Sequence, residues 1–283
     1  MPMKLLLVRH SWGFDRPLAD LIPWAKARGY EAIETSVVGM TEATADDLRR
    51  RLEAADLGLV AQIATGGYGV GAHRTVAGDL ASFADQTALA VRLGARLINA
   101  HSGLDAWPAA EVRHFYRELA QREADLPIPV AHETHRGRCF HSAWVVRDLL
   151  PDLPESLRFC ADFSHWCCVA ERLVEDQVEV IQAVARRTIH LHARVGHGQG
   201  PQVSDPRLPR WASAVAAHER WWDLVWDAQE AAGMQVSSLT PEFGPDPYLE
   251  PSDDPLADRQ RLEDICEWQT QRQAARFHGR PAR

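Results

Sequence analysis

Short hydrophobic stretches alternate with amphipathic stretches along the whole chain. The hydrophobic stretches predict eight strands, at residues 4–10, 30–36, 58–64, 95–101, 128–133, 157–162, 188–194 and 236–242. The amphipathic stretches predict helices at 18–28, 44–55, 75–93, 109–123, 143–150, 175–185 and 218–232, with a last helix at 256–276. Strands that alternate with helices predict a parallel sheet whose connections are right-handed crossovers.

Eight such units fit a closed (β/α)8 barrel, a TIM barrel, better than an open doubly wound sheet. No GxGxxG turn follows the first strand, so a dinucleotide-binding fold is disfavoured. Gly29, Gly94 and Gly233 each stand between a predicted helix and the next strand, as expected of helix C-caps. We expect one domain over 1–283. The Gly- and Pro-rich segment 195–217 is too long for a plain connector and is expected to be an active-site lid.

Composition and charge narrow the possible partners. The 283 residues are 46 % hydrophobic and 25 % charged, as in soluble globular proteins, and the net charge is −8. Basic residues are dispersed among acidic ones, so no nucleic-acid partner is expected. The apolar run before Arg9 has only four residues, too few for a signal peptide or a membrane span, which favours a cytoplasmic protein without membrane contact. The five cysteines have no CxxC spacing and are interpreted as reduced thiols.

Polar residues stand where the last four predicted strands end. In a parallel barrel, the active site forms at the carboxyl ends of the strands. Because strand side chains alternate between two faces, three carboxylates and one imidazole are expected to converge there, from Glu133, Asp162, His192 and Glu242. Crowded anions repel one another, and a divalent cation is the simplest way to neutralise them. Such a set, without a thiolate, favours Mn²⁺, Mg²⁺ or Co²⁺ over Zn²⁺.

Each of these residues also has an ordinary structural interpretation. A carboxylate directly after a strand is often a helix N-cap, and Asp162 before Phe163 and Ser164 fits that role equally well. A single histidine such as His190 is more often a hydrogen-bonded interior residue than a ligand. Four suitable groups at four successive strand ends are much harder to explain by capping, so the set carries the metal hypothesis.

At these positions the sequence resembles the xylose isomerase-like barrels, the superfamily of sugar phosphate isomerases and epimerases. That superfamily includes ketose 3-epimerases, inosose dehydratases and hydroxypyruvate isomerases. The resemblance is carried by HETHRGR at 132–138, DFSHW at 162–166, IHLHARVGHGQGPQV at 189–203 and TPEFGP at 240–245.

The resemblance implies that Glu133 and Glu242 are both metal ligands and the catalytic acid/base pair. Asp162 and His192 would be ligands only, and His165 would contact the substrate. The family often has an arginine shortly after the seventh-strand histidine. This chain departs from that pattern, because Arg194 comes too early and Gly198 lies near the expected position.

The leading hypothesis is a metal-dependent isomerase or epimerase of a ketose-like sugar. The metal would hold a carbonyl and the neighbouring hydroxyl, and an enediolate would form when one glutamate removes the proton between them. The alternative is a lyase or dehydratase, in which the same enediolate expels a β-leaving group from a keto-sugar or keto-inositol. The acid for that step could come from any of four histidines, His165, His101, His135 and His197.

Residues near the strand ends are candidates to bind the substrate. The set comprises His165, His101, Arg138, Arg194, His197, Trp12 and Trp166. Tryptophan rings stack well on sugar faces, although those in loops, which also include Trp107 and Trp211, can equally pack the loops together.

Arg136 and Arg138 could bind an anionic group on the substrate. No glycine-rich phosphate cradle follows the last strands, which favours a non-phosphorylated carbohydrate. Tryptophans in helical stretches pack the helices or a partner subunit, so a homo-oligomer is possible.

Two other classes fit less well. A phosphodiesterase acting on DNA, as in the endonuclease branch of this fold, needs a basic binding face, and the pI near 5.9 opposes it. A binding protein without catalysis would hold four candidate ligands without using them.

Overall fold

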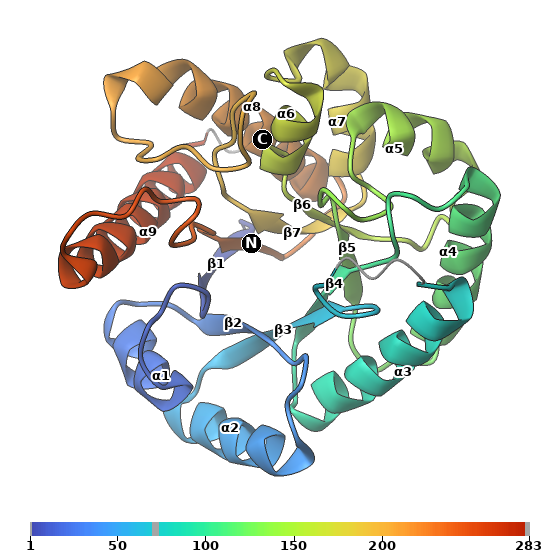
Figure 1. The fold of residues 1–283 in the computed structure, drawn as a ribbon, viewed down its shortest axis with the longest axis horizontal. Helices are drawn as coiled ribbons and strands as arrows, with labels where there is room; N and C mark the ends of the chain where they lie inside the picture. Colours follow the sequence, from blue (N-terminus) through green and yellow to red (C-terminus); the bar gives the residue numbers. More distant parts are fainter. Residues whose placement is uncertain (1, 70–73, 281–283) are drawn as a thin grey trace.

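The computed structural model describes residues 2–69 and 74–280, and within them eight parallel strands close into a barrel (Figure 1). The strands are β1 (Lys4–His10), β2 (Ala32–Ser36), β3 (Gly58–Ala64), β4 (Leu97–His101), β5 (Val130–Glu133), β6 (Phe159–Ala161), β7 (Thr188–His192) and β8 (Val236–Thr240). Each strand pairs with its neighbours in sequence, and β1 pairs with β8 to close the ring. The predicted (β/α)8 fold is therefore confirmed.

Helices surround the barrel as an outer layer (Figure 1). They are α1 (Leu18–Ala27), α2 (Glu42–Ala55), α3 (Val76–Arg92), α4 (Ala109–Glu123), α5 (Ala143–Leu149), α6 (Ser164–Ala170), α7 (Val178–Ala185), α8 (Ala212–Ala231) and α9 (Pro255–His278). Three short 3-10 turns accompany them, at η1 (Leu150–Asp152), η2 (Glu175–Gln177) and η3 (Pro209–Trp211). Gly29, Gly94 and Gly233 all have positive φ, as their predicted positions after helices require.

The structure corrects the extent of one loop and adds one helix. The segment 195–217, expected to be all loop, is helical from Ala212, because the alanine-rich start of α8 has high helix propensity and follows the turn η3. The remaining loop is 195–211. Helix α6, directly after β6, was not predicted because seven residues are too few to show a helical period.

The inside of the barrel has two layers that follow from strand alternation. Its lower layer is apolar and consists of Val8, Ala32, Val60, Leu97, Ala131 and Cys160, all buried. The side chain two residues further along a strand points to the same side. That step leads from Val8 to His10, from Ala131 to Glu133 and from Cys160 to Asp162. The same alternation therefore places polar groups directly above the apolar layer, at the carboxyl ends of the strands.

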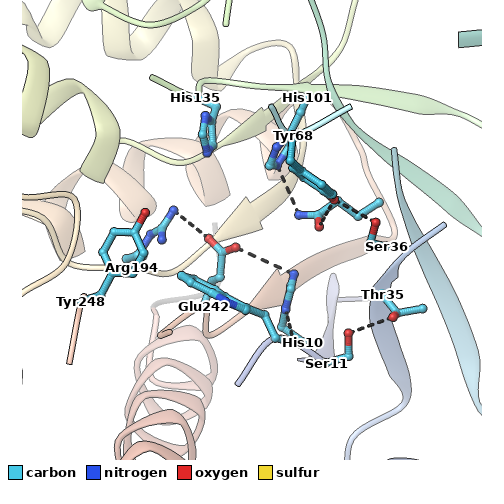
Figure 2. Close-up of a pocket in the computed structure, with 12 residues that line it drawn as sticks. His10, Ser11, Thr35, Ser36, Tyr68, His101, His135, Arg194, Glu242 and Tyr248 are labelled. Atoms are coloured by element: carbon cyan, nitrogen blue, oxygen red, sulfur yellow. Dashed lines mark hydrogen bonds and ion pairs between the residues drawn. The ribbon is translucent and has the colours of Figure 1, made fainter. Parts of the chain in front are cut away.

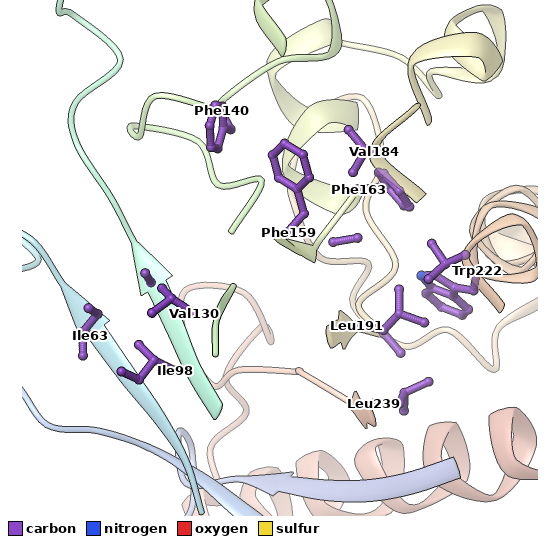
Figure 3. Packing of buried hydrophobic residues seen from close by; sticks show 14 of the residues in the cluster. Ile63, Ile98, Val130, Phe140, Phe159, Phe163, Val184, Leu191, Trp222 and Leu239 are labelled. Carbon is purple, nitrogen blue, oxygen red and sulfur yellow. The ribbon is translucent and has the colours of Figure 1, made fainter. Parts of the chain in front are cut away.

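The larger core lies between the strands and the helices (Figure 3). Leu191 on β7, Leu239 on β8 and Trp222 on α8 are wholly buried there. Burial of one such side chain contributes about 1.5–3 kcal/mol relative to leaving it in water. The outward-facing residues of the strands therefore supply stability, while their inward-facing neighbours near the barrel mouth are free to be polar.

No helix in the described part of the chain is long and apolar enough to cross a membrane. The five cysteines are all free thiols, and four of them are buried.

Candidate metal centre and substrate cavity

The four residues predicted as ligands come together at the carboxyl ends of the strands. Glu133 ends β5 and His192 ends β7, while Asp162 directly follows β6 and Glu242 lies two residues after β8. One side-chain ligand atom from each lies within 4.8 Å of those of the other three, and all four residues are buried. Their chemistry, three carboxylates and one imidazole, suits a divalent cation that prefers oxygen ligands.

The negative charges of the cluster also favour a bound cation. Glu133 Oε1 is buried and has no hydrogen-bond partner among the described residues, which leaves this ligand oxygen free to bind a cation. Burial raises the pKa of Asp162 to about 6, even though Arg194 acts to lower it, because Glu242 and Glu133 add their negative charges. Burial also acts to raise the pKa of Glu242, but Arg194 and His192 outweigh it and hold this pKa below its ordinary value. Neutralising three such carboxylates calls for positive charge.

Asp162 contacts the start of α6 but is not its N-cap, which is Phe163. Its Oδ1 accepts a hydrogen bond of 2.9 Å from the backbone N–H of Ser164, the first residue of α6. Its Oδ2 lies on the other side, 2.9 Å from Arg194 Nη2. One carboxylate oxygen therefore bonds to the residue that begins a short helix, and the other is paired with the arginine.

Arg194 lies inside the cluster, which the sequence did not indicate. Its Nη2 is 2.9 Å from Asp162 Oδ2 and 3.0 Å from Glu242 Oε2. The same atom lies 2.6 Å from His165 Nε2. Although burial opposes the charge, Glu242 and Asp162 raise the pKa of Arg194 well above its ordinary value. This guanidinium therefore supplies positive charge to two of the carboxylates.

Glu34 is a further residue of the site whose role the sequence left open. It is fully buried on β2, and its Oε1 lies 3.0 Å from His192 Nε2. Thr240 Oγ1 and Asn99 Nδ2 donate hydrogen bonds of 2.7 and 3.0 Å to the same carboxylate. Because Nε2 of His192 is engaged by Glu34, its Nδ1 faces the cluster, 3.1 Å from Glu242 Oε2. A carboxylate behind a histidine in this way fixes the ring and its tautomer.

The signal for Glu34 was a charged residue at an inward position of an otherwise ordinary strand. The role of Glu34 on β2 follows from its contact with His192 on β7 inside the barrel. The sequence of a single strand does not reveal this contact.

Three histidine rings lie against one another beside Glu133. The ring of His135 is 4.4 Å from that of His101 and 3.8 Å from that of His165, centroid to centroid. His101 Nε2 is 2.7 Å from Glu133 Oε2. Glu133, His101 and His135 also form a second group with three ligand atoms within 4.8 Å. Burial lowers the pKa of His135 to about 3, with the His101 charge acting the same way, so its ring is neutral at neutral pH.

A cavity of about 410 Å³ opens beside the cluster (Figure 2). Its wall includes Arg194 and Glu242 together with hydroxyl and amide groups, three histidines and three aromatic rings. These other lining residues are Ser11, Thr35, Ser36, Gln62, His10, His101, His135, Trp12, Tyr68 and Tyr248. The volume lies within the range of small-molecule sites, about 300–1,000 Å³. Figure 2 shows the Glu242 carboxylate between Arg194 and His10 in this wall.

The predicted substrate residues divide by location. Trp12, His101 and Arg194 line the cavity. His165 is buried behind it, against Arg194. Trp166 is packed in the outer core, where its Nε1 donates to the carbonyl of Phe140.

The other two predicted substrate residues also lie away from this cavity. Arg138 donates hydrogen bonds of 3.0 and 2.8 Å to the carbonyls of Thr65 and Gly67, and so holds the loop that carries Tyr68. His197 lies in a neighbouring cavity, against the ring of Trp211.

The fold and the cluster define a TIM barrel with a buried group of carboxylate and imidazole side chains that could bind a metal ion. The family model for xylose isomerase-like TIM barrels matches residues 22–204. The chain therefore belongs to the xylose isomerase-like TIM barrel family. No curated protein matches the sequence.

Solved structures with the same fold differ in activity. One is the probable 3-DHS dehydratase AsbF from Bacillus anthracis, with 15 % identity over 96 % of this chain and 99 % of that one, and a TM-score of 0.60. Another is a D-psicose 3-epimerase in the presence of D-fructose, with 14 % identity over 96 % and 99 % and a TM-score of 0.64. Endonuclease IV from Thermus thermophilus has 17 % identity over 94 % and 98 % and a TM-score of 0.57. At these identities the similarity establishes the fold alone.

Proposed function

We propose that the protein is a divalent-metal-dependent isomerase or epimerase of ketose-like sugars. The observation that carries the proposal is the position of Glu242, whose carboxylate belongs to the four-ligand cluster and also lines the cavity. A base that abstracts a proton next to a carbonyl must lie within reach of that carbon, and a carbonyl held by the metal would lie close to this carboxylate. The sugar named with the similar D-psicose 3-epimerase supports the same substrate class.

Glu133, Asp162, His192 and Glu242 would hold the metal ion. When bound, the ion acts as a Lewis acid that polarises the substrate carbonyl and stabilises the enediolate. Glu34 would keep His192 Nδ1 directed at the site through its contact with Nε2. Arg194, which faces both Asp162 and the cavity, would bind a substrate oxygen and balance the charge of the carboxylates.

The two glutamates approach the reacting region from different strands. Glu242 follows β8 and lies in the cavity wall. Glu133 ends β5 and touches His101, which lines the same cavity, through a contact of 2.7 Å. In the proposed reaction one glutamate removes the proton and the other returns it, on the opposite face for epimerisation or on the adjacent carbon for isomerisation.

The wall of the cavity suits a polyhydroxylated ligand. Hydroxyl groups of Ser11 and Thr35 and the amide of Gln62 offer hydrogen bonds to sugar hydroxyls. Trp12 and Tyr248 offer aromatic faces and edges, 5.3 Å apart between ring centroids. A combination of a few polar groups with aromatic rings is typical of sites that fix the orientation of a small polar molecule.

A lyase or dehydratase is the second candidate, because three histidines line the same wall. His10, His101 and His135 surround the cavity. Burial lowers the pKa of His10 and of His135, so both rings are neutral at neutral pH. His101, which contacts Glu133, is therefore the histidine placed to donate a proton to a leaving group. Product analysis separates the two reactions, since elimination gives an unsaturated ketone and epimerisation gives an isomeric sugar.

The test uses the metal-loaded protein with a panel of ketoses and keto-sugars in D₂O. Glu133→Gln and Glu242→Gln should each keep the fold and abolish deuterium incorporation at the reacting carbon. Glu179→Gln, at an exposed position on α7, is the matched control and should exchange like the wild type. Exchange at the wild-type rate in both site variants would refute the proposed roles.

A further inference from the structure

A second cavity of about 480 Å³ lies next to the substrate cavity. It is built from three loops at the carboxyl ends of the strands. The loop after β5 contributes Arg136, the loop 195–211 contributes its central residues, and the loop after β8 contributes Asp246 to Pro251. Tyr248 lines both cavities, so its side chain is a wall that the two cavities share.

Tyr248 stands between two arginines, one facing each cavity. Arg136 Nη2 donates a hydrogen bond of 2.9 Å to its hydroxyl from the side of the second cavity. The guanidinium carbon of Arg194 lies 5.9 Å from its ring centroid on the side of the substrate cavity. Since Arg194 also contacts Glu242, a ligand that spanned both sides of Tyr248 would have one end beside the proposed base and the other in the second cavity.

The wall of the second cavity mixes charges of both signs that do not neutralise one another. Arg136 and Arg210 supply guanidinium groups, and Asp246 and Glu250 supply carboxylates. Within the described residues, none of these four side chains forms an ion pair. Balanced donors and acceptors of this kind match a neutral ligand with many hydroxyls, each of which both donates and accepts. A ligand with a single strong charge would meet repulsion from two of the four.

The second cavity is held open by contacts of its own loops. Gln202 forms two reciprocal hydrogen bonds with the backbone of Gly244, at 2.7 and 3.0 Å. The guanidinium carbon of Arg210 lies 5.1 Å from the ring centroid of Trp211, and the ring of His197 lies 4.7 Å from the same ring. Such a preformed wall reduces the ordering that binding would otherwise require.

We propose that the second cavity is a subsite for a second sugar ring, so that the substrate class is a keto-disaccharide or similar glycoside rather than a free monosaccharide. This inference rests on the proposed function for the reacting ring. The reacting ring occupies the cavity beside Glu242, and the glycosidic substituent passes Tyr248 to reach Arg136 and Arg210.

The test measures binding of unreactive sugars, which does not depend on turnover. Glucose, methyl glucoside, cellobiose and trehalose are titrated into the metal-loaded protein, and affinity is followed by saturation-transfer NMR. At least one disaccharide should bind about tenfold more tightly than the one-ring sugars, as two additional hydrogen bonds allow. Equal affinity for one-ring and two-ring sugars, or binding of neither, would overturn the subsite.

Substitutions of the two arginines in the second cavity test whether the second sugar ring binds there. Arg136→Ala and Arg210→Ala should each reduce the preference for the disaccharide by about tenfold. Arg207→Ala is the matched control, because Arg207 lies in the same loop, pairs with Asp205 and is outside both cavities. An unchanged preference in both cavity variants would contradict the assignment. Disaccharide binding without turnover of any keto form would refute the proposed reaction and leave the subsite standing.

Discussion

Arg194 and Glu242 form an ion pair within the wall of the substrate cavity, with Nη2 and Oε2 3.0 Å apart. The same guanidinium also bonds to Asp162, so one side chain neutralises two of the four candidate metal ligands. A bound metal ion would therefore share these carboxylates with the arginine.

Replacement of Arg194 should destabilise the protein mainly when metal is removed. Breaking a buried ion pair costs about 3–5 kcal/mol, because the partner charges remain buried and unpaired. Arg194→Met should lower the free energy of unfolding by about this amount in chelator-treated protein. A saturating divalent ion should recover part of the loss, since it binds the folded state selectively. Calorimetry with and without Mn²⁺ measures the difference, and an equal loss in both conditions would argue against a shared role.

Glu34→Gln should weaken metal binding without unfolding the protein. Glu34 holds His192 by its Nε2, and loss of such a supporting carboxylate typically costs about 10–100-fold in metal affinity. Isothermal titration of Mn²⁺ into the chelator-treated variant gives the affinity directly. Glu31→Gln is the control, because Glu31 is outside the barrel interior and pairs with Lys4. Wild-type affinity in Glu34→Gln would show that the contact does not orient the histidine.

Acid should loosen the loop 195–211 through His218. Burial lowers the pKa of His218 to about 4, and its neutral Nε2 accepts a hydrogen bond of 3.2 Å from the backbone N–H of Gly196. The groups packed on the ring are Cys167, Trp221 and Trp222. Between pH 6.5 and about 4, the unfolded histidine binds a proton that the folded one does not. The free energy of unfolding therefore falls as pH decreases through this window, by up to about 1.4 kcal/mol per pH unit.

Below pH 4 both states of His218 are protonated, and its contribution no longer changes. Burial also lowers the pKa of His10, His135 and His165, which add to the same trend. The contribution of His218 is therefore the difference in slope between the wild type and His218→Gln, measured by urea unfolding. Identical slopes would exclude this residue.

Gly198→Ala should displace the loop 195–211 from α6. A Cβ at this position would lie 2.6 Å from the backbone carbonyl oxygen of Glu171, and backbone cannot move aside as a side chain can. We expect faster trypsin cleavage at Arg207 and Arg210 and a lower kcat/KM. Gly69→Ala is the control, because an added Cβ there meets no atom within 4 Å. If the loop closes as a lid, substrate should slow cleavage of the wild type, and a cleavage rate that substrate leaves unchanged would count against closure.

The period-two alternation of the strands made much of this molecule predictable. It identified the eight strands and placed Glu133, Asp162, His192 and Glu242 on one side of the barrel wall, because each stands at the end of a short apolar run. Features that depend on contacts between distant segments were not predictable. Arg194 and Asp162 are 32 residues apart, and their contact becomes visible only when β6 and β7 pair.

Strand lengths and loop shapes were predicted less accurately. The strand expected at 157–162 ends at Ala161, because Asp162 turns its Oδ1 to the first residue of α6. The second cavity needs three loops from different parts of the chain, and no local pattern in any one of them indicates it.

In this barrel, the strand register decides both which side chains are buried in the core and which side chains reach the cluster. On β5, His132 points outward to Glu123 of α4, while Glu133 points inward to the cluster. One residue inserted earlier in this strand would exchange the two, and would place an imidazole in the barrel and a carboxylate among the helices. Such an insertion would harm stability and chemistry together. The strand register does not constrain the lengths of the loops. Substitutions and insertions that change specificity but keep the proposed reaction are therefore expected in the loops.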